Sequence, residues 1–259
     1  MSNQFNLARF GRLFRKHTAE HGRGYLLSVA VLLGLLAVLM GTQAYVQNDP
    51  MIPPIQMGYL IFFLLLGGAM FTSTVFASLA DKKQAIAALT LPASHLEKYL
   101  VGWLYSYVLF TLACIGCFYV VDAAVVSFDN WHGRPAELLN FFDAKYKAYY
   151  ALLVYAFMHA IAIWGAVYFE KMQLVKTAFL FFIGVAALFV VNFQLVQLLL
   201  DHVTGNMVVP FGDIDLGIGK EHYRLALPTE KRQWLGVLPA LLVGLFWLAG
   251  YFRVQEKQI

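Results

Sequence analysis

Few side chains in this sequence have the types and spacing needed for chemistry. Cys114 and Cys117 have the spacing of a redox pair, but both lie in a long apolar stretch, where a reactive thiolate is disfavoured. We interpret them as packing residues. His17 and His21 are four residues apart, as two metal ligands on one helical face would be, but no His-Glu-x-x-His motif accompanies them. The sequence therefore predicts no metal site.

The motifs that resemble nucleotide and calcium sites are incomplete. The Gly-Ile-Gly-Lys stretch at 217–220 lacks the spacing and the Ser or Thr of a phosphate-binding loop, so ATP hydrolysis would need another chain. Asp213 and Asp215 could begin a calcium loop, but its sixth and twelfth positions hold Ile218 and Arg224 instead of Gly and Glu. We expect no catalytic residue and no cofactor.

His159 is the ionisable side chain that lies deepest in an apolar stretch. Polar groups inside a membrane usually face the interior of a helix bundle and can mark a transport pathway. Asn192, Gln194 and Gln197 could join His159 in such a pathway lining. Hydrogen bonding between helices, worth about 0.6 kcal/mol per bond, would explain the same residues without a pathway, and we favour that interpretation.

Six apolar stretches must position these residues. They cover 25–46, 57–80, 99–121, 148–169, 177–200 and 234–252. About 20 helical residues cross a bilayer, and continuous apolar stretches exclude the alternation of a membrane β-barrel. Charged residues make up 13% of the chain, against about 25% in soluble domains. The sequence predicts an all-α membrane protein with one transmembrane domain, a six-helix bundle over residues 1–259.

The Lys and Arg residues are divided unevenly between the two sides of this bundle. One set of termini and connections holds twelve of them, and the opposite set holds seven. Because cytoplasmic segments are enriched in Lys and Arg, both termini are expected in the cytoplasm of a bacterial inner membrane. The outer loops are then 122–147 and 201–233. The net charge of +4 follows this topology and does not indicate nucleic acid.

The segment 1–23 before the first span is basic and amphipathic. Its apolar face holds Phe10, Leu13, Phe14 and His17, and its basic face holds Arg9, Arg12, Arg15 and Lys16. This pattern is typical of an interfacial helix that binds membrane lipid through both faces. The plainer interpretation is a positively charged anchor that only orients the first span.

The outer loops carry weaker patterns. Ile214, Leu216 and Ile218 alternate with polar or small residues, as do Tyr223, Leu225 and Leu227. Gly219 and Lys220 between them suit a two-residue turn, so we expect a small outer β-hairpin. In the other loop, Pro135 and the apolar residues after it favour an interfacial helix.

Small residues form a stripe on the second span. Ala69, Ser73 and Ala77 follow at four-residue spacing. Such stripes let helix backbones approach closely. The stripe could form a subunit interface or pack within the chain, and both interpretations stay open.

The connection between the second and third spans has the clearest local pattern. Residues 81–89 can form a short helix, which Pro92 then ends. Ser94 and Glu97 form a capping box, in which each side chain bonds the backbone N–H of the other residue. The pattern predicts a short cytoplasmic helix, a proline break and a sharply started third span. A plain helical hairpin would give much of the same pattern.

With this connection, the basic N-terminus and six spans, the chain resembles the membrane (permease) subunit of a type-2 ATP-binding-cassette transporter. In that family, the connection is a coupling helix that docks on the ATPase. The resemblance implies an ATPase-coupling region made of Lys82, Lys83, Ile86, Leu89, Leu91, Pro92, Ser94 and Glu97. It also implies two partners: a cytoplasmic ATPase subunit and a second membrane subunit, which can be the same or a different chain. The long polar segment 201–233 departs from the short re-entrant helices usual in the family.

The hypothesis is therefore a permease subunit of an ATP-binding-cassette transporter, an exporter that couples ATP hydrolysis by its partner to substrate movement. The chain itself is not expected to be an enzyme. The alternative is a non-transporting membrane sensor or assembly scaffold that acts through its outer loops. An intramembrane enzyme is least favoured, because the sequence shows no nucleophile–base or metal constellation.

Overall fold

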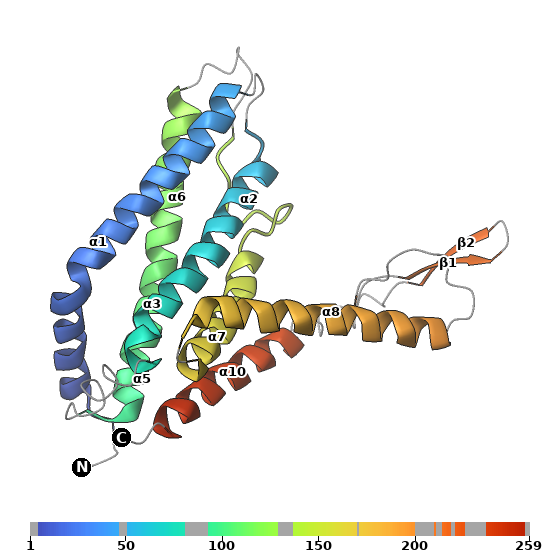
Figure 1. The fold of residues 1–259 in the computed structure, drawn as a ribbon. Helices are drawn as coiled ribbons and strands as arrows, with labels where there is room; N and C mark the ends of the chain where they lie inside the picture. The colour runs from blue at the N-terminus through green and yellow to red at the C-terminus, as the bar shows by residue number, and fades with distance from the viewer. Residues whose placement is uncertain are drawn as a thin grey trace.

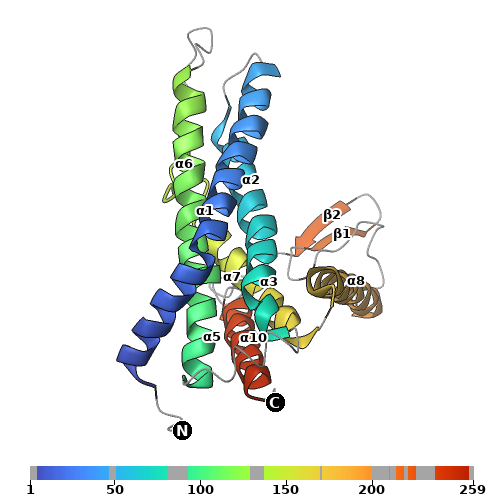
Figure 2. The same ribbon diagram turned by 60° about the vertical axis from the view of Figure 1, so that its left-hand side comes forward.

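The computed structural model describes residues 5–46, 51–80, 93–128, 137–169, 171–199, 210, 214–218, 221–225 and 237–256. Within these ranges, only the backbone is described for 78–80, 214–218 and 221–225. Figures 1 and 2 show the fold from two directions.

Six helical stretches of the described chain are long and apolar enough to cross a membrane. They are α1 (Leu7–Val46); α2 (Pro53–Phe62), η1 (Phe63–Gly67) and α3 (Gly68–Ala80) in succession; α5 (His95–Trp103), η2 (Leu104–Leu109) and α6 (Phe110–Phe128) in succession; α7 (Tyr150–Tyr168); α8 (Gln173–Leu199); and α10 (Val237–Glu256). The segments η1 and η2 are π-helical, with wider turns than the α-helices around them. The chain is a multi-span membrane protein.

The first helix differs from the sequence prediction of an interfacial helix followed by a separate span. α1 continues without a break for 40 residues, about 60 Å, through Gly22 and Gly24. Its N-terminal apolar face packs on other helices of the chain: Phe14 stacks on Tyr105 with ring centroids 4.9 Å apart. This packing offsets the cost of about 1 kcal/mol that each interior glycine adds.

Most of the helices form a bundle, and α8 extends away from it (Figure 1). α1, α6 and the α2–α3 rod lie side by side, and α7 and α10 pack together beneath them (Figures 1 and 2). The N- and C-termini lie at one end of the bundle, which we call the terminal end (Figure 1). α8 leaves the bundle after α7 and runs away from it, with most of its apolar side chains exposed. Such an exposed apolar helix suits lipid or another membrane subunit as its surroundings.

Two larger apolar clusters and a smaller one between α7 and α10 fill the described part of the bundle. The first joins α1, α2 and α6 and includes Leu36, Met40, Leu60 and Phe118. The second joins α3, α5, α7 and α10 and includes Phe76, Val101, Ile163 and Val254. Cys114 and Cys117 are buried free thiols of the first cluster, in agreement with their interpretation as packing residues.

The segment 137–149 does not form the interfacial helix that the sequence suggested; Pro135 lies outside the described residues. This segment consists of turns, and its Leu139 side chain is buried against the first cluster. The Tyr119 hydroxyl donates to the Leu139 carbonyl at 2.9 Å, and Gln56 Nε2 donates to the Glu137 carbonyl at 2.8 Å. Asn140 also accepts a bond from the backbone N–H two residues later. Such side-chain bonds compete with helical ones and explain the difference.

Two short strands pair in the last connection. β1 (Ile214–Ile218) and β2 (Glu221–Leu225) are antiparallel, with Ile214 opposite Leu225 and Ile218 opposite Glu221. The pairing agrees with the predicted hairpin, although the second strand begins at Glu221 instead of Tyr223. The turn residues 219–220 and Leu227 lie outside the described residues.

Candidate functional site

The start of α5 lies at the terminal end and carries the predicted capping box. Ser94 has an extended backbone, and its Oγ accepts the Glu97 N–H at 3.2 Å. Glu97 Oε2 in turn accepts the Ser94 N–H at 3.0 Å. Both bonds of the predicted box are therefore present, and they satisfy two backbone donors that a helix start otherwise leaves unpaired.

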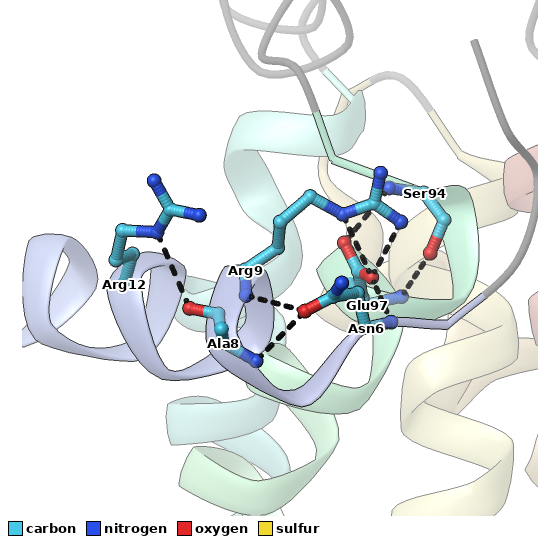
Figure 3. Close-up of polar contacts among 6 residues, drawn as sticks. All are labelled: Asn6, Ala8, Arg9, Arg12, Ser94 and Glu97. Carbon is cyan, nitrogen blue, oxygen red and sulfur yellow. Dashed lines mark hydrogen bonds and ion pairs between the residues drawn. The ribbon is translucent and has the colours of Figure 1, made fainter.

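The other carboxylate oxygen of Glu97 binds the N-terminal segment (Figure 3). Glu97 Oε1 accepts the Asn6 N–H at 2.8 Å and the Arg9 Nη2 and Nε groups at 3.1 and 3.3 Å. Asn6 is itself a capping residue, because its Oδ1 accepts the backbone N–H groups of Ala8 and Arg9 at 2.9 and 3.3 Å. One carboxylate thus joins the first turns of α1 and α5, which are about 90 residues apart.

Electrostatics favour an ionised Glu97 in this junction, which lies just before the apolar stretch 99–121. Burial opposes the charge, but the bonds from the Asn6 N–H, the Ser94 N–H and the Arg9 guanidinium all stabilise the charged carboxylate. The N-terminal ends of two helices add a favourable dipole field at the same carboxylate. We call this arrangement of Asn6, Arg9, Ser94 and Glu97 the α1–α5 clamp.

The clamp lies at the end of the connection that the family resemblance implies to be an ATPase-coupling region. Lys82, Lys83, Ile86, Leu89, Leu91 and Pro92 lie outside the described residues. Ser94 and Glu97 are described, and both are buried. The carboxylate of Glu97 is engaged within the chain, so its structural role is to fix the end of this connection to α1.

His159 is completely buried, and both of its ring nitrogens are hydrogen-bonded. The Trp247 indole N–H donates to Nδ1 at 3.2 Å, which assigns the imidazole proton to Nε2. Nε2 then donates to Ser106 Oγ at 2.9 Å, and the Ser106 hydroxyl donates to the Gly102 carbonyl at 2.8 Å. A neutral histidine therefore joins α7, η2 and α10, as the hydrogen-bonding interpretation of this residue predicts.

The other three candidate pathway residues are on α8. Gln194 and Gln197 are exposed, and Asn192 is half-buried. They lie toward the end of α8 that is distant from the bundle (Figure 1). The structure does not bring them together with His159 into one polar lining.

The small-residue stripe lies beside the closest helix contact of the second span. Ala69, Ser73 and Ala77 are each half-buried. The fully buried positions are Gly68, Thr72 and Phe76, one residue earlier in each turn. A Cβ atom at Gly68 would lie 2.8 Å from Cζ of Tyr155 on α7, so this close approach requires glycine.

The remaining candidate ligands, His17 and His21, stack on one face of α1 with ring centroids 4.5 Å apart. His17 Nε2 is 2.6 Å from the Tyr25 hydroxyl, so this histidine is bonded within the helix. Across the described part of the chain, no group of three or more His, Cys, Asp or Glu side chains could hold a metal ion.

Several contacts at these sites were not predicted from the sequence. Asn6 just before the amphipathic pattern is a recognisable N-cap signal. Arg9 could be singled out among the basic residues only by its contact with Glu97. Tyr155 and Trp247 are aromatic residues of apolar stretches. Their polar atoms bond Ser106 and His159, which are distant in the sequence, so no local pattern predicts these bonds.

Comparison with known proteins adds no family to this picture. No protein-family model matches the chain, and no curated protein matches it either. The geometry of the clamp and of the buried His159 therefore carries the functional interpretation.

Proposed function

We propose that this chain is the permease subunit of an ATP-binding-cassette transporter, an exporter of a bacterial inner membrane with both termini in the cytoplasm. A separate ATPase subunit hydrolyses ATP, and a second membrane subunit, identical or different, completes the substrate path. The chain itself has no catalytic role in this proposal. ATP-driven movement of the ATPases shifts the populations of inward- and outward-open states of the bundle.

The α1–α5 clamp is the observation that supports this proposal most. The connection 81–92 leads directly into Ser94, where the capping box begins the third span. The buried carboxylate of Glu97 fixes this point to the first turn of α1. A force applied to the connection therefore reaches two spans at once, because displacement of either helix would break the partly buried Arg9–Glu97 ion pair and the Asn6–Glu97 bond.

The position of the chain ends also supports the proposed orientation. Both termini lie at the end of the bundle that carries the clamp (Figure 1). Six spans return the chain to the side on which it started. The exposed basic side chains Arg12, Arg15 and Lys16 lie on α1 near this end, as the positive-inside rule requires of a cytoplasmic side.

The test is affinity purification of the tagged full chain from its native membranes, with identification of the proteins that co-purify. We expect a soluble ATPase with a phosphate-binding loop, and its loss when Lys82→Glu and Lys83→Glu are combined. The matched control combines Lys171→Glu, in the connection between α7 and α8, with Lys176→Glu, in the first turn of α8. This control should retain the ATPase.

Recovery of intact protein without any ATPase would contradict the transporter proposal. Function would then be sought in the alternative class, a membrane sensor or assembly scaffold. In that case the paired strands β1 and β2, in the connection between α8 and α10, are a candidate binding module. Deleting residues 210–228 and repeating the purification would show which partners depend on it.

A further inference from the structure

The third span contains a local change of helix type at its centre. In η2 the backbone bonds depart from the α-helical pattern: the Phe110 N–H donates to the carbonyls of Tyr105 and Tyr107. In an α-helix the same N–H would donate to Ser106, four residues earlier. The wide turn therefore releases the Ser106 carbonyl from its expected α-helical donor.

A side chain from another helix uses the released carbonyl. The Tyr155 hydroxyl of α7 donates to it at 2.7 Å, and the Tyr155 side chain is completely buried. The ring of Tyr155 also stacks on Tyr107 of η2, with centroids 5.5 Å apart and an interplanar angle of 12°. Tyr155 thus holds η2 both by its hydroxyl and by its ring.

The end of the second π-helical segment, η1, lies next to the same tyrosine. η1 ends at Gly67, and Gly68 directly after it packs on the Tyr155 ring, where a Cβ would lie 2.8 Å from Cζ. A Cβ at Gly67 would lie 3.3 Å from Cζ of Phe110, the residue that follows η2. Two wide turns on neighbouring spans therefore lie around Tyr155. Such turns are common at functional sites and at helix bends.

Both halves of the third span pack on α1, but their hydrogen bonds go to different parts of the chain. α5 is bound at the terminal end through Glu97 to α1, and through the Tyr99 hydroxyl to the Trp247 carbonyl of α10 at 2.9 Å. α6 is bound at its middle through the Tyr119 hydroxyl to the Leu139 carbonyl. η2 is the joint between these halves.

We propose that the third span bends at η2 and that Tyr155 is the latch that holds α5 and α6 in the arrangement seen here. Opening of the latch breaks the bond between the Tyr155 hydroxyl and the Ser106 carbonyl. The Phe110 N–H, which now donates to the Tyr105 and Tyr107 carbonyls, can then move to the Ser106 carbonyl, its α-helical acceptor. The Ser106 carbonyl therefore keeps a donor in the opened state. The helix thus has two discrete hydrogen-bonding arrangements, as a bistable element requires. This inference does not depend on an ATPase partner.

The test measures the distance across η2 in the full chain. Spin labels are placed at Leu96 and Phe128, in a background without Cys114 and Cys117, and the protein is studied in lipid nanodiscs by pulsed electron paramagnetic resonance. The 32 residues between the labels correspond to about 48 Å of helix. Tyr155→Phe removes the latch hydroxyl and keeps the ring. We expect about a fivefold increase in the population of a second, bent distance, the factor that loss of one hydrogen bond produces.

Two controls separate a latch from general loosening of the fold. Tyr119→Phe removes an equivalent tyrosine–carbonyl bond from α6, and the Leu96–Phe128 distribution should not change. In the Tyr155→Phe variant, a label pair at Leu112 and Phe128 should also be unchanged, because it does not cross η2. Equal Leu96–Phe128 distributions for Tyr155→Phe and the unsubstituted protein would overturn the proposal.

A second variant keeps the proposal testable if Tyr155→Phe fails to insert. Gly68→Ala places a methyl group against the Tyr155 ring and pushes the hydroxyl from its acceptor. It should increase the same bent population. An unchanged distribution in this variant, with the protein folded, would equally refute the latch.

Discussion

Replacing Glu97 with Gln tests the α1–α5 clamp without changing its shape. The carboxylate accepts bonds through both oxygens, from Asn6 and Arg9 on one and from Ser94 on the other. A glutamine has one acceptor oxygen, so its amino group must face at least one buried N–H. That unsatisfied donor costs about 1–3 kcal/mol, and loss of the charge-assisted bond to Arg9 costs a further 1 kcal/mol or so. We therefore expect a loss of about 3 kcal/mol for Glu97→Gln.

This loss should appear locally as opening of the first turn of α1. The assay is amide hydrogen exchange of residues 6–12 in lipid nanodiscs, because exchange reports the free energy of local opening. At about 1.4 kcal/mol per tenfold change, 3 kcal/mol corresponds to roughly 100-fold faster exchange. Exchange at the far end of the bundle, for example in residues 118–125, should be unaffected.

Glu20→Gln is the matched control on the same helix. Glu20 pairs with Lys16 at 3.7 Å, but both side chains are about half exposed, and such a pair contributes at most about 0.5 kcal/mol. Exchange should rise no more than about threefold in this variant. If Glu97→Gln also changed the exchange of residues 6–12 by less than threefold, the clamp would not hold α1 to α5.

Two further predictions concern packing and buried polar groups. Gly165→Ala should destabilise the protein by about 1–3 kcal/mol, because a Cβ there would lie 2.7 Å from Cβ of Thr177. The same change at Gly34, with nothing within 4 Å, should leave the thermal unfolding midpoint unchanged or slightly higher. His159→Leu leaves the Trp247 indole N–H without its acceptor and should lower the midpoint by an amount equivalent to about 1–3 kcal/mol. A midpoint of Gly165→Ala or of His159→Leu equal to that of the unsubstituted protein would contradict the corresponding prediction.

The features predicted correctly from the sequence depend on neighbouring residues. The six spans follow from the length of each apolar stretch, and the Ser94–Glu97 box follows from a spacing of three residues. The hairpin followed from alternation on either side of Gly219. Each of these signals is complete within one stretch of chain, so no knowledge of the packing is needed.

The features that were missed depend on contacts between distant stretches. Arg9 looks like any other basic residue of its segment until Glu97 is placed beside it. The sequence of η2 contains no Gly or Pro that would predict a departure from the α-helix. The contact that stabilises η2 comes from Tyr155 on another helix. The continuity of α1 through Gly22 and Gly24 likewise depends on packing of Phe14 against Tyr105, a contact that local propensity cannot supply.

The clamp has a consequence for the order in which the chain is made. Asn6 and Arg9 leave the ribosome about 90 residues before Glu97, which is roughly 5–20 s at ordinary rates of synthesis. During that interval Arg9 is without the Glu97 carboxylate and can add its charge to those that orient the first span. Once the third span begins, the carboxylate neutralises Arg9 and closes α1 onto α5. One arginine can thus serve first in insertion and later in assembly.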